Sequence, residues 1–85
     1  MRFTVVWTAS TQDDLAALWL SATNRSVLQR AADDIDRRLG TDAHRQGRPF
    51  FEDRILVVPP LAVAFSVSLP DRLVTVWQVW SREVA

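Results

Sequence analysis

The sequence contains no cysteine and no tyrosine, and it has only one histidine, two glycines and four prolines. Without cysteine, disulfide bonds, thiol chemistry and cysteine-ligated zinc or iron–sulfur sites are excluded. The low glycine and proline content excludes collagen-like and low-complexity chains, and an apolar fraction of 48% excludes intrinsic disorder. With one histidine and no Gly-x-Ser motif to present a nucleophile, a Ser-His-Asp triad has no support.

Lysine is also absent, so all ten basic residues are arginine, and they balance ten acidic residues. A net charge near zero argues against strong nonspecific attraction to nucleic acid. No P-loop, dinucleotide-binding or metal-ligand spacing is present, so we expect no metal and no cofactor. No apolar run approaches the ~20 residues that cross a bilayer, and residues 1–4 lead into a strand pattern without a signal peptide. We therefore expect a cytoplasmic protein without a membrane partner.

The length of 85 residues predicts a single domain spanning residues 1–85. Residues 2–8 alternate with Phe3, Val5 and Trp7 on the bulkier face, which predicts a strand. A helix capped by Ser10 or Thr11 should follow. Its apolar residues recur at helical spacing; they are Leu15, Leu18, Trp19 and Ala22.

A second helix is predicted over residues 25–39, with Asn24 as its cap and Gly40 as its stop signal. One side is apolar. The other carries the i,i+4 pairs Asp33–Arg37 and Asp34–Arg38, which are typical of a solvated helix face rather than a catalytic acid–base set. Residues 40–49 read as a polar loop, in which His44 is expected to be exposed.

Three strands are predicted at residues 53–58, 61–68 and 73–80. In the middle one, large residues alternate with the small residues Ala62, Ala64 and Ser66. The last is apolar on both faces, which is typical of a strand inside a sheet. The expected fold class is α+β, with the order β-α-α-β-β-β and a helix hairpin on one face of a four-stranded, mostly antiparallel sheet.

The faces of these strands predict a core and a binding surface. Trp7, Trp19 and Trp77 fit core positions, and Phe65 should be buried with Trp19 between the helices and the sheet. The small residues on the opposite face predict a shallow trough, with Trp80 beside it and arginines at its ends that could hold a phosphate or a carboxylate. The candidate partner-binding residues are Arg54, Ala62, Ala64, Ser66, Trp80 and Arg82. Arg54 and Arg82 are also the candidate catalytic residues.

The order of these segments resembles the RelE/ParE superfamily of bacterial toxins from toxin–antitoxin modules, a class associated with plasmid stabilization. The similar positions are short motifs in the right order: Trp7-Thr8, Asp14-Leu15, Leu18, Gly47, Arg54, the run 63–67, Pro70-Asp71 and the strand 74–79. Phe65 replaces a frequent tyrosine, and Thr11 stands where alanine is common.

The resemblance implies a small α+β toxin that a cognate antitoxin holds inactive. ParE-like members inhibit DNA gyrase, whereas RelE-like members cleave mRNA on the ribosome. Ala62 stands where the nucleases carry an arginine, and only Arg82 matches a basic residue expected after the last strand. Missing proton-transfer groups would cost such a nuclease ~10²–10⁴-fold in rate. The sequence therefore favours a ParE-like target-binding toxin without enzymatic activity.

Two alternatives stay open at this point. One is a RelE-like endoribonuclease that uses Arg54 and Arg82, with or without His44. The other is a protein of the same fold that has lost toxicity and serves only to bind its partner.

Overall fold

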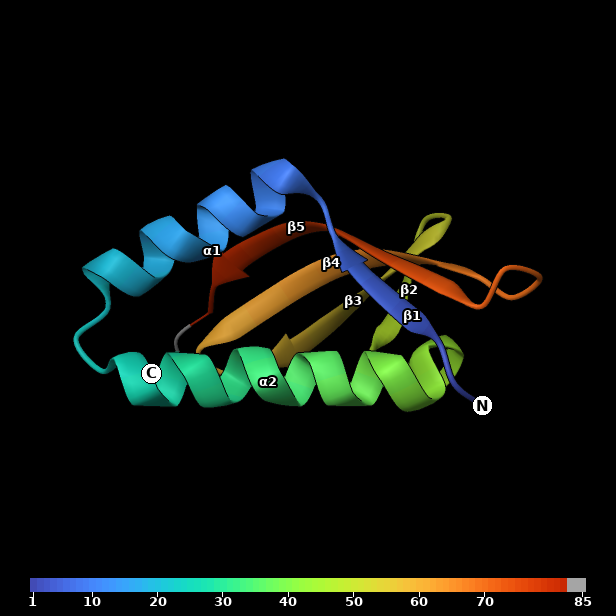
Figure 1. Cartoon of the computed structure of the whole chain (residues 1–85), viewed down its shortest axis with the longest axis horizontal. Helices are drawn as coiled ribbons and strands as arrows, with labels where there is room; N and C mark the ends of the chain where they lie inside the picture. Colours follow the sequence, from blue (N-terminus) through green and yellow to red (C-terminus); the bar gives the residue numbers. More distant parts are fainter. Residues whose placement is uncertain (83–85) are drawn as a thin grey trace.

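The computed structural model describes residues 1–82. It contains β1 (Thr4–Trp7), α1 (Ala9–Ser21), α2 (Arg25–Asp42), the short 3₁₀ helix η1 (Ala43–Arg45), β2 (Arg48–Phe50), β3 (Asp53–Val58), β4 (Leu61–Ser68) and β5 (Leu73–Ser81). The strands form one sheet in the order β1-β5-β4-β3-β2, and both long helices lie on one side of it (Figure 1). The predicted α+β class and element order are confirmed.

The pairing of the strands gives a mixed sheet. β1 runs parallel to β5, and the pairs β5–β4, β4–β3 and β3–β2 are antiparallel. The parallel pair joins the first and the last strand of the chain, and both helices and the other three strands lie between them in the sequence. Among residues 1–82, none of the helices is long and apolar enough to span a membrane.

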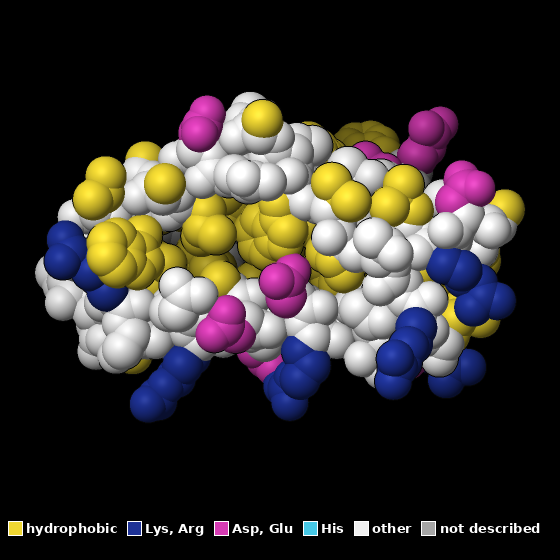
Figure 2. Space-filling view, viewed as in Figure 1, with side chains coloured by type: hydrophobic (Ala, Val, Ile, Leu, Met, Phe, Trp, Pro, Cys, Tyr) yellow, Lys and Arg dark blue, Asp and Glu magenta, His cyan; other side chains and the backbone are white. Residues whose placement is uncertain are grey.

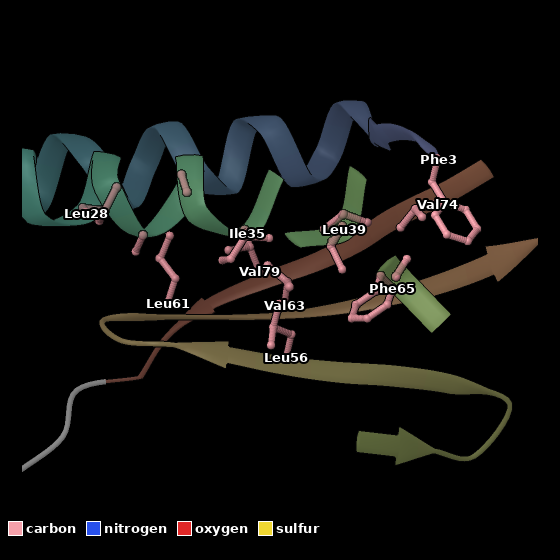
Figure 3. Close-up of a cluster of buried hydrophobic side chains, with 14 residues drawn as sticks. Phe3, Leu28, Ile35, Leu39, Leu56, Leu61, Val63, Phe65, Val74 and Val79 are labelled. Carbon is pink, nitrogen blue, oxygen red and sulfur yellow. The ribbon is translucent and has the colours of Figure 1, made fainter. Parts of the chain in front are cut away.

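The core lies between α2 and the middle of the sheet. Leu28, Ile35 and Leu39 of α2 point toward the sheet in Figure 3, where β4 contributes Leu61, Val63 and Phe65. The β4 side chains are fully buried, which confirms the face that the alternation of this strand predicts. Asn24 caps α2, as expected, because its side chain accepts a hydrogen bond from the Val27 N–H.

Two boundaries differ from the prediction. Gly40 does not end α2, which continues to Asp42. A glycine costs a helix only about 1 kcal/mol relative to alanine, and here its carbonyl accepts a hydrogen bond of 2.8 Å from the Phe3 N–H. The sheet has one strand more than the four predicted. The additional strand is β2, which has three residues, and two of them, Arg48 and Pro49, come from the predicted loop. So short a strand carries no periodic signal.

Two tryptophans do not occupy the predicted core positions. Trp19 is 39% exposed. The reason is that α1 packs mainly against β5, so that Trp19 lines a groove between α1 and α2 instead of the core. Trp77 is also 39% exposed. A β-bulge explains it: Ala64 pairs with Gln78 and Phe65 with Val76, so Trp77 is an extra residue in β5. The bulge breaks the alternation on which the prediction relied.

The N-cap residue of α1 also differs from the prediction. Thr8, rather than Ser10 or Thr11, is the N-cap residue, and its side chain accepts a hydrogen bond from the Thr11 N–H. Thr11 is instead buried, with its hydroxyl 2.6 Å from that of Thr8. The two threonines therefore fix the turn from β1 into α1.

Replacing Gly47 by alanine is expected to lower the free energy of unfolding by about 2–3 kcal/mol. Gly47 has a φ of +67°, and a Cβ there would collide with the backbone carbonyl of Ile55 in β3. Gly40→Ala is the matched control, because a Cβ at that helical position meets only ordinary contacts. Chemical denaturation of both variants should show a loss for Gly47→Ala and none for Gly40→Ala. Equal stability of the two variants would contradict this account.

Candidate partner-binding surfaces

The sheet face opposite the helices is uncovered, and we call it the open sheet face. The strand register places small and large apolar side chains on it together. Ala62 lies between Val57 and Trp80, and Ala64 lies between Ile55 and Gln78. Large side chains thus flank small ones, which is the arrangement that the predicted trough requires.

A shallow cavity of about 350 Å³ lies on this face. Its lining comes from four strands and consists of Phe50, Ile55, Ala64, Trp77, Gln78 and Trp80. Trp80 therefore lies at the trough, as its position beside the small residues predicts. Because of the bulge, Trp77 joins it there, so that two tryptophans rather than one border the cavity.

The two candidate arginines do not converge. Arg54 pairs with Phe65, which places it on the helix side of the sheet, and its guanidinium donates hydrogen bonds to the carbonyls of Gln46 (2.7 Å) and Gly47 (3.2 Å). Arg82 follows Ser81, which pairs with Leu61 at the start of β4, whereas Phe65 lies in the middle of that strand. The four-residue separation along β4 corresponds to about 13 Å of strand.

The expected bracketing of the trough by two arginines is therefore wrong for Arg54. Arg54 lies on the helix side of the sheet, and its guanidinium is hydrogen-bonded to two backbone carbonyls, so it does not border the open sheet face. Its hydrogen bonds instead fix Gln46 and Gly47, which directly precede β2. Arg82 is exposed, and its backbone N–H donates to the Pro60 carbonyl at 2.7 Å.

A second apolar surface is the groove between α1 and α2, which encloses about 440 Å³. Figure 2 shows hydrophobic side chains gathered in the hollow between these helices. Trp7 of β1, Leu15 and Trp19 of α1, and Leu28 and Ala32 of α2 are among its lining residues. The groove exists because α1 buries only Thr11 completely and leaves its apolar side half-covered.

The α2 side of this groove is acidic. Asp33 and Asp36 line it, and Figure 2 shows acidic side chains beside the hollow. Asp36 accepts a hydrogen bond of 2.7 Å from the Trp7 indole N–H, and Asp33 accepts one of 3.0 Å from the Gln29 amide. At the other end, the Arg25 guanidinium lies 4.6 Å from the centre of the Trp19 ring. The groove thus combines an apolar floor with two carboxylates.

The outer face of α2 is a surface ion-pair network. Arg38 lies 2.9 Å from Asp34, and Arg37 contacts the same carboxylate. The hydrogen bond from Arg37 lowers the pKa of Asp34. The expected Asp34–Arg38 pair is present, whereas Asp33 bonds to Gln29 rather than to Arg37. These exposed groups fit the predicted solvated face.

His44 is not the exposed loop residue that the sequence predicts. It lies in η1, half-buried, with its ring 5.7 Å from that of Phe3. Its Nδ1 is 3.6 Å from an Asp42 carboxylate oxygen. Within the described residues, no group of three His, Cys, Asp or Glu side chains is placed to hold a metal ion.

Sequence reasoning missed the groove and the contribution of Phe50 and Trp77 to the open sheet face. The signal for the groove was present in the apolar stripe of the first predicted helix, whose Leu15 and Trp19 line it. Phe50 gave no signal, because it lies between the predicted loop of residues 40–49 and the predicted strand of residues 53–58, in a strand of only three residues.

The fold of the chain is similar to those of several solved structures. No protein-family model matches the sequence, and no curated protein sequence does. Among solved structures, the toxin–antitoxin complex RelBE2 of Mycobacterium tuberculosis contains a chain that aligns with a TM-score of 0.82 at 16% identity, covering 99% of this chain and 95% of that one. A chain of the chromosomal ParDE system of P. aeruginosa aligns with a TM-score of 0.69 at 20% identity, covering 98% of each chain.

A third similar structure is the archaeal RelE–RelB complex of Pyrococcus horikoshii, with a TM-score of 0.69 at 13% identity and complete coverage of both chains. The isolated E. coli RelE toxin aligns with a TM-score of 0.63 at 11% identity. These likenesses extend over the whole length of the chain and include both RelE and ParE systems. The chain therefore has the fold of the RelE/ParE toxins of toxin–antitoxin systems.

Proposed function

We propose that the chain is the toxin of a toxin–antitoxin pair and that a cognate antitoxin binds it. The observation that carries this proposal is the presence of two uncovered apolar surfaces on opposite sides of the sheet, the open sheet face and the groove between α1 and α2. Two tryptophans border each surface. Tryptophan is enriched among residues that dominate binding energy. One extended partner that wraps around the domain would cover both surfaces.

On the open sheet face, the partner would contact Ser66, Trp80 and Arg82, whereas Ala62 and Ala64, which are 0% and 2% exposed, would lie beneath the larger side chains that it touches. Apolar side chains of the partner would fill the 350 Å³ cavity. In the groove, a short amphipathic helix with a lysine or arginine would pair with Asp33 and Asp36 while its apolar side contacts Trp7 and Trp19. The net charge of zero makes local complementarity, rather than overall attraction, the basis of recognition.

For the toxic activity, we propose ParE-like inhibition of a protein target such as DNA gyrase, acting in the cytoplasm. The nuclease alternative needs basic and proton-transfer groups around one scissile phosphate. Here Arg54 lies beside the middle of β4 on the helix side of the sheet, whereas Arg82 lies beside the start of β4, and the Arg54 guanidinium donates hydrogen bonds to two backbone carbonyls. A target-binding toxin requires no such cluster.

The test is to express the chain in bacteria, alone and together with the product of the reading frame immediately upstream or downstream of its gene. We expect growth arrest with the chain alone and normal growth with one neighbouring product. Purified chain should inhibit supercoiling by gyrase and leave mRNA intact in a ribosome-dependent translation reaction. Codon-specific mRNA cleavage would support the RelE-like alternative, and growth without arrest would indicate a partner-binding module without toxicity.

A further inference from the structure

Trp19 is held in place by a residue outside its own helix. Arg25, the first residue of α2, reaches back over the turn of residues 22–24 to the end of α1. Its guanidinium donates hydrogen bonds from Nε to the Trp19 carbonyl (3.1 Å) and from Nη2 to the Leu20 carbonyl (3.2 Å). The same group lies over the Trp19 ring, 4.6 Å from its centre. One arginine therefore contacts both the backbone and the side chain of Trp19.

These contacts suit a guanidinium in particular. The carbonyls in the last turn of a helix have no partner within the helix, and the helix dipole favours a cation beside them. The sequence of α1 contains no basic residue, so Arg25 supplies that charge from α2. A planar guanidinium can donate to two carbonyls and stack on an aromatic ring at the same time, whereas the ammonium of lysine is a single point charge.

The position of Trp19 makes this restraint relevant to binding. The ring is partly exposed and lines the groove between α1 and α2, with Asp33 and Asp36 on the α2 side. An exposed tryptophan has several rotamers, and fixing one of them when a partner binds costs conformational entropy. A ring that is already fixed in the free chain avoids this cost. The guanidinium covers one face of the ring, so the rest of the ring is available to the groove.

We propose that Arg25 is a positioning residue for antitoxin binding, which holds the Trp19 ring as a preformed wall of the groove. This inference rests on the function proposed above, in which an amphipathic helix with a lysine or arginine occupies the groove. The carboxylates of Asp33 and Asp36 beside the apolar floor select that occupant, because a basic side chain can pair with them. Arg25 acts through Trp19 and does not itself touch the antitoxin. Its loss therefore weakens binding only while Trp19 is present.

A double-mutant cycle tests this dependence. The wild type, Arg25→Gln, Trp19→Ala and the double variant are titrated against the purified product of the neighbouring reading frame that suppresses toxicity. We expect the dissociation constant to rise about 5- to 10-fold for Arg25→Gln, because one side chain must then be ordered on binding. It should rise about 30-fold or more for Trp19→Ala. Adding Arg25→Gln to Trp19→Ala should change it by less than about twofold.

A spectroscopic measurement on the free chain separates positioning from a general loss of structure. With 5-fluorotryptophan in place of all four tryptophans, the fluorine resonance of Trp19 is assigned by its absence in Trp19→Ala. Arg25→Gln should shift that resonance and leave the others in place, while the melting temperature falls by no more than about 8 °C.

Arg45→Gln is the matched control, because it removes the same charge from a distant place. Arg45 is exposed in η1 and lines neither the groove nor the cavity of the open sheet face. The substitution should change neither the affinity nor the Trp19 resonance.

Three affinity results would overturn the positioning role and leave the proposed function intact. They are an affinity of Arg25→Gln within about twofold of the wild type, the same result for Trp19→Ala, or equal effects of Arg25→Gln with and without Trp19. The last result would mean that Arg25 itself contacts the antitoxin. An unshifted Trp19 resonance in Arg25→Gln would also overturn the role. A wild-type chain that binds neither neighbouring product would overturn the proposed function as well.

Discussion

Replacing Phe65 by alanine is expected to lower the free energy of unfolding by about 3–5 kcal/mol. Phe65 is completely buried, and it is the largest of the side chains that are. It lies in the middle of the sheet beneath the helices, between Arg54 of β3 and Val76 of β5. A domain of this size has a total stability of only about 4–13 kcal/mol. The melting temperature should therefore fall by more than about 12 °C.

Trp19→Ala is the control for this prediction, because it also removes a large aromatic ring but from a position that is 39% exposed. We expect it to cost no more than about 1.5 kcal/mol, since part of the ring already contacts water. Thermal melts of the two variants would measure the difference. If Phe65→Ala melts within a few degrees of the wild type, the assignment of Phe65 to the core is wrong.

Replacing Ala64 by arginine is expected to weaken antitoxin binding by about 100-fold or more, corresponding to about 2.7 kcal/mol. Ala64 lines the cavity on the open sheet face, and a guanidinium there would fill the space intended for the partner's apolar side chains. A charge buried in that interface without a counter-ion is unfavourable. Trp80→Ala should weaken binding less, by about 30-fold. Titration against the neighbouring product that suppresses toxicity would measure both effects.

The control for Ala64→Arg is Ala17→Arg, which introduces the same side chain on an exposed position of α1. Ala17 lines neither the open-face cavity nor the groove, so its variant should bind as the wild type does. Melting curves must accompany the titrations, because Ala64 is itself nearly inaccessible under its larger neighbours. If Ala64→Arg is folded and binds like Ala17→Arg, the open sheet face is not the antitoxin surface.

The sequence was sufficient to predict the α+β class, the order of helices and strands and the two faces of β4. These features depend on local periodicity, and Leu61, Val63 and Phe65 alternate with smaller residues without interruption. The order of motifs also pointed to the toxin fold, although each motif is short. For β4 and α2, whose faces follow an unbroken pattern of two or 3.6 residues, the prediction was confirmed. The stripe of α1 has the same helical spacing, but its Trp19 is 39% exposed.

The errors came from features that depend on partners distant in sequence. The bulge at Trp77 is visible only in the register between β4 and β5, and it moves that ring to the open sheet face. Arg54 was placed at the trough because it opens a strand, but its pairing with Phe65 puts it on the helix side. Gly40 remains helical, and its carbonyl accepts a hydrogen bond from the N–H of Phe3, which directly precedes β1. None of these contacts has a local signature.

The most direct test of the account is the growth of bacteria that express the Ala64→Arg chain together with the neighbouring product that suppresses the wild-type chain. The account predicts that Ala64→Arg still arrests growth alone and that co-expression no longer restores it, because the open sheet face cannot be covered. The wild type and Ala17→Arg should be rescued in parallel. Full rescue of a folded, toxic Ala64→Arg chain would contradict the claim that the antitoxin acts by covering this face.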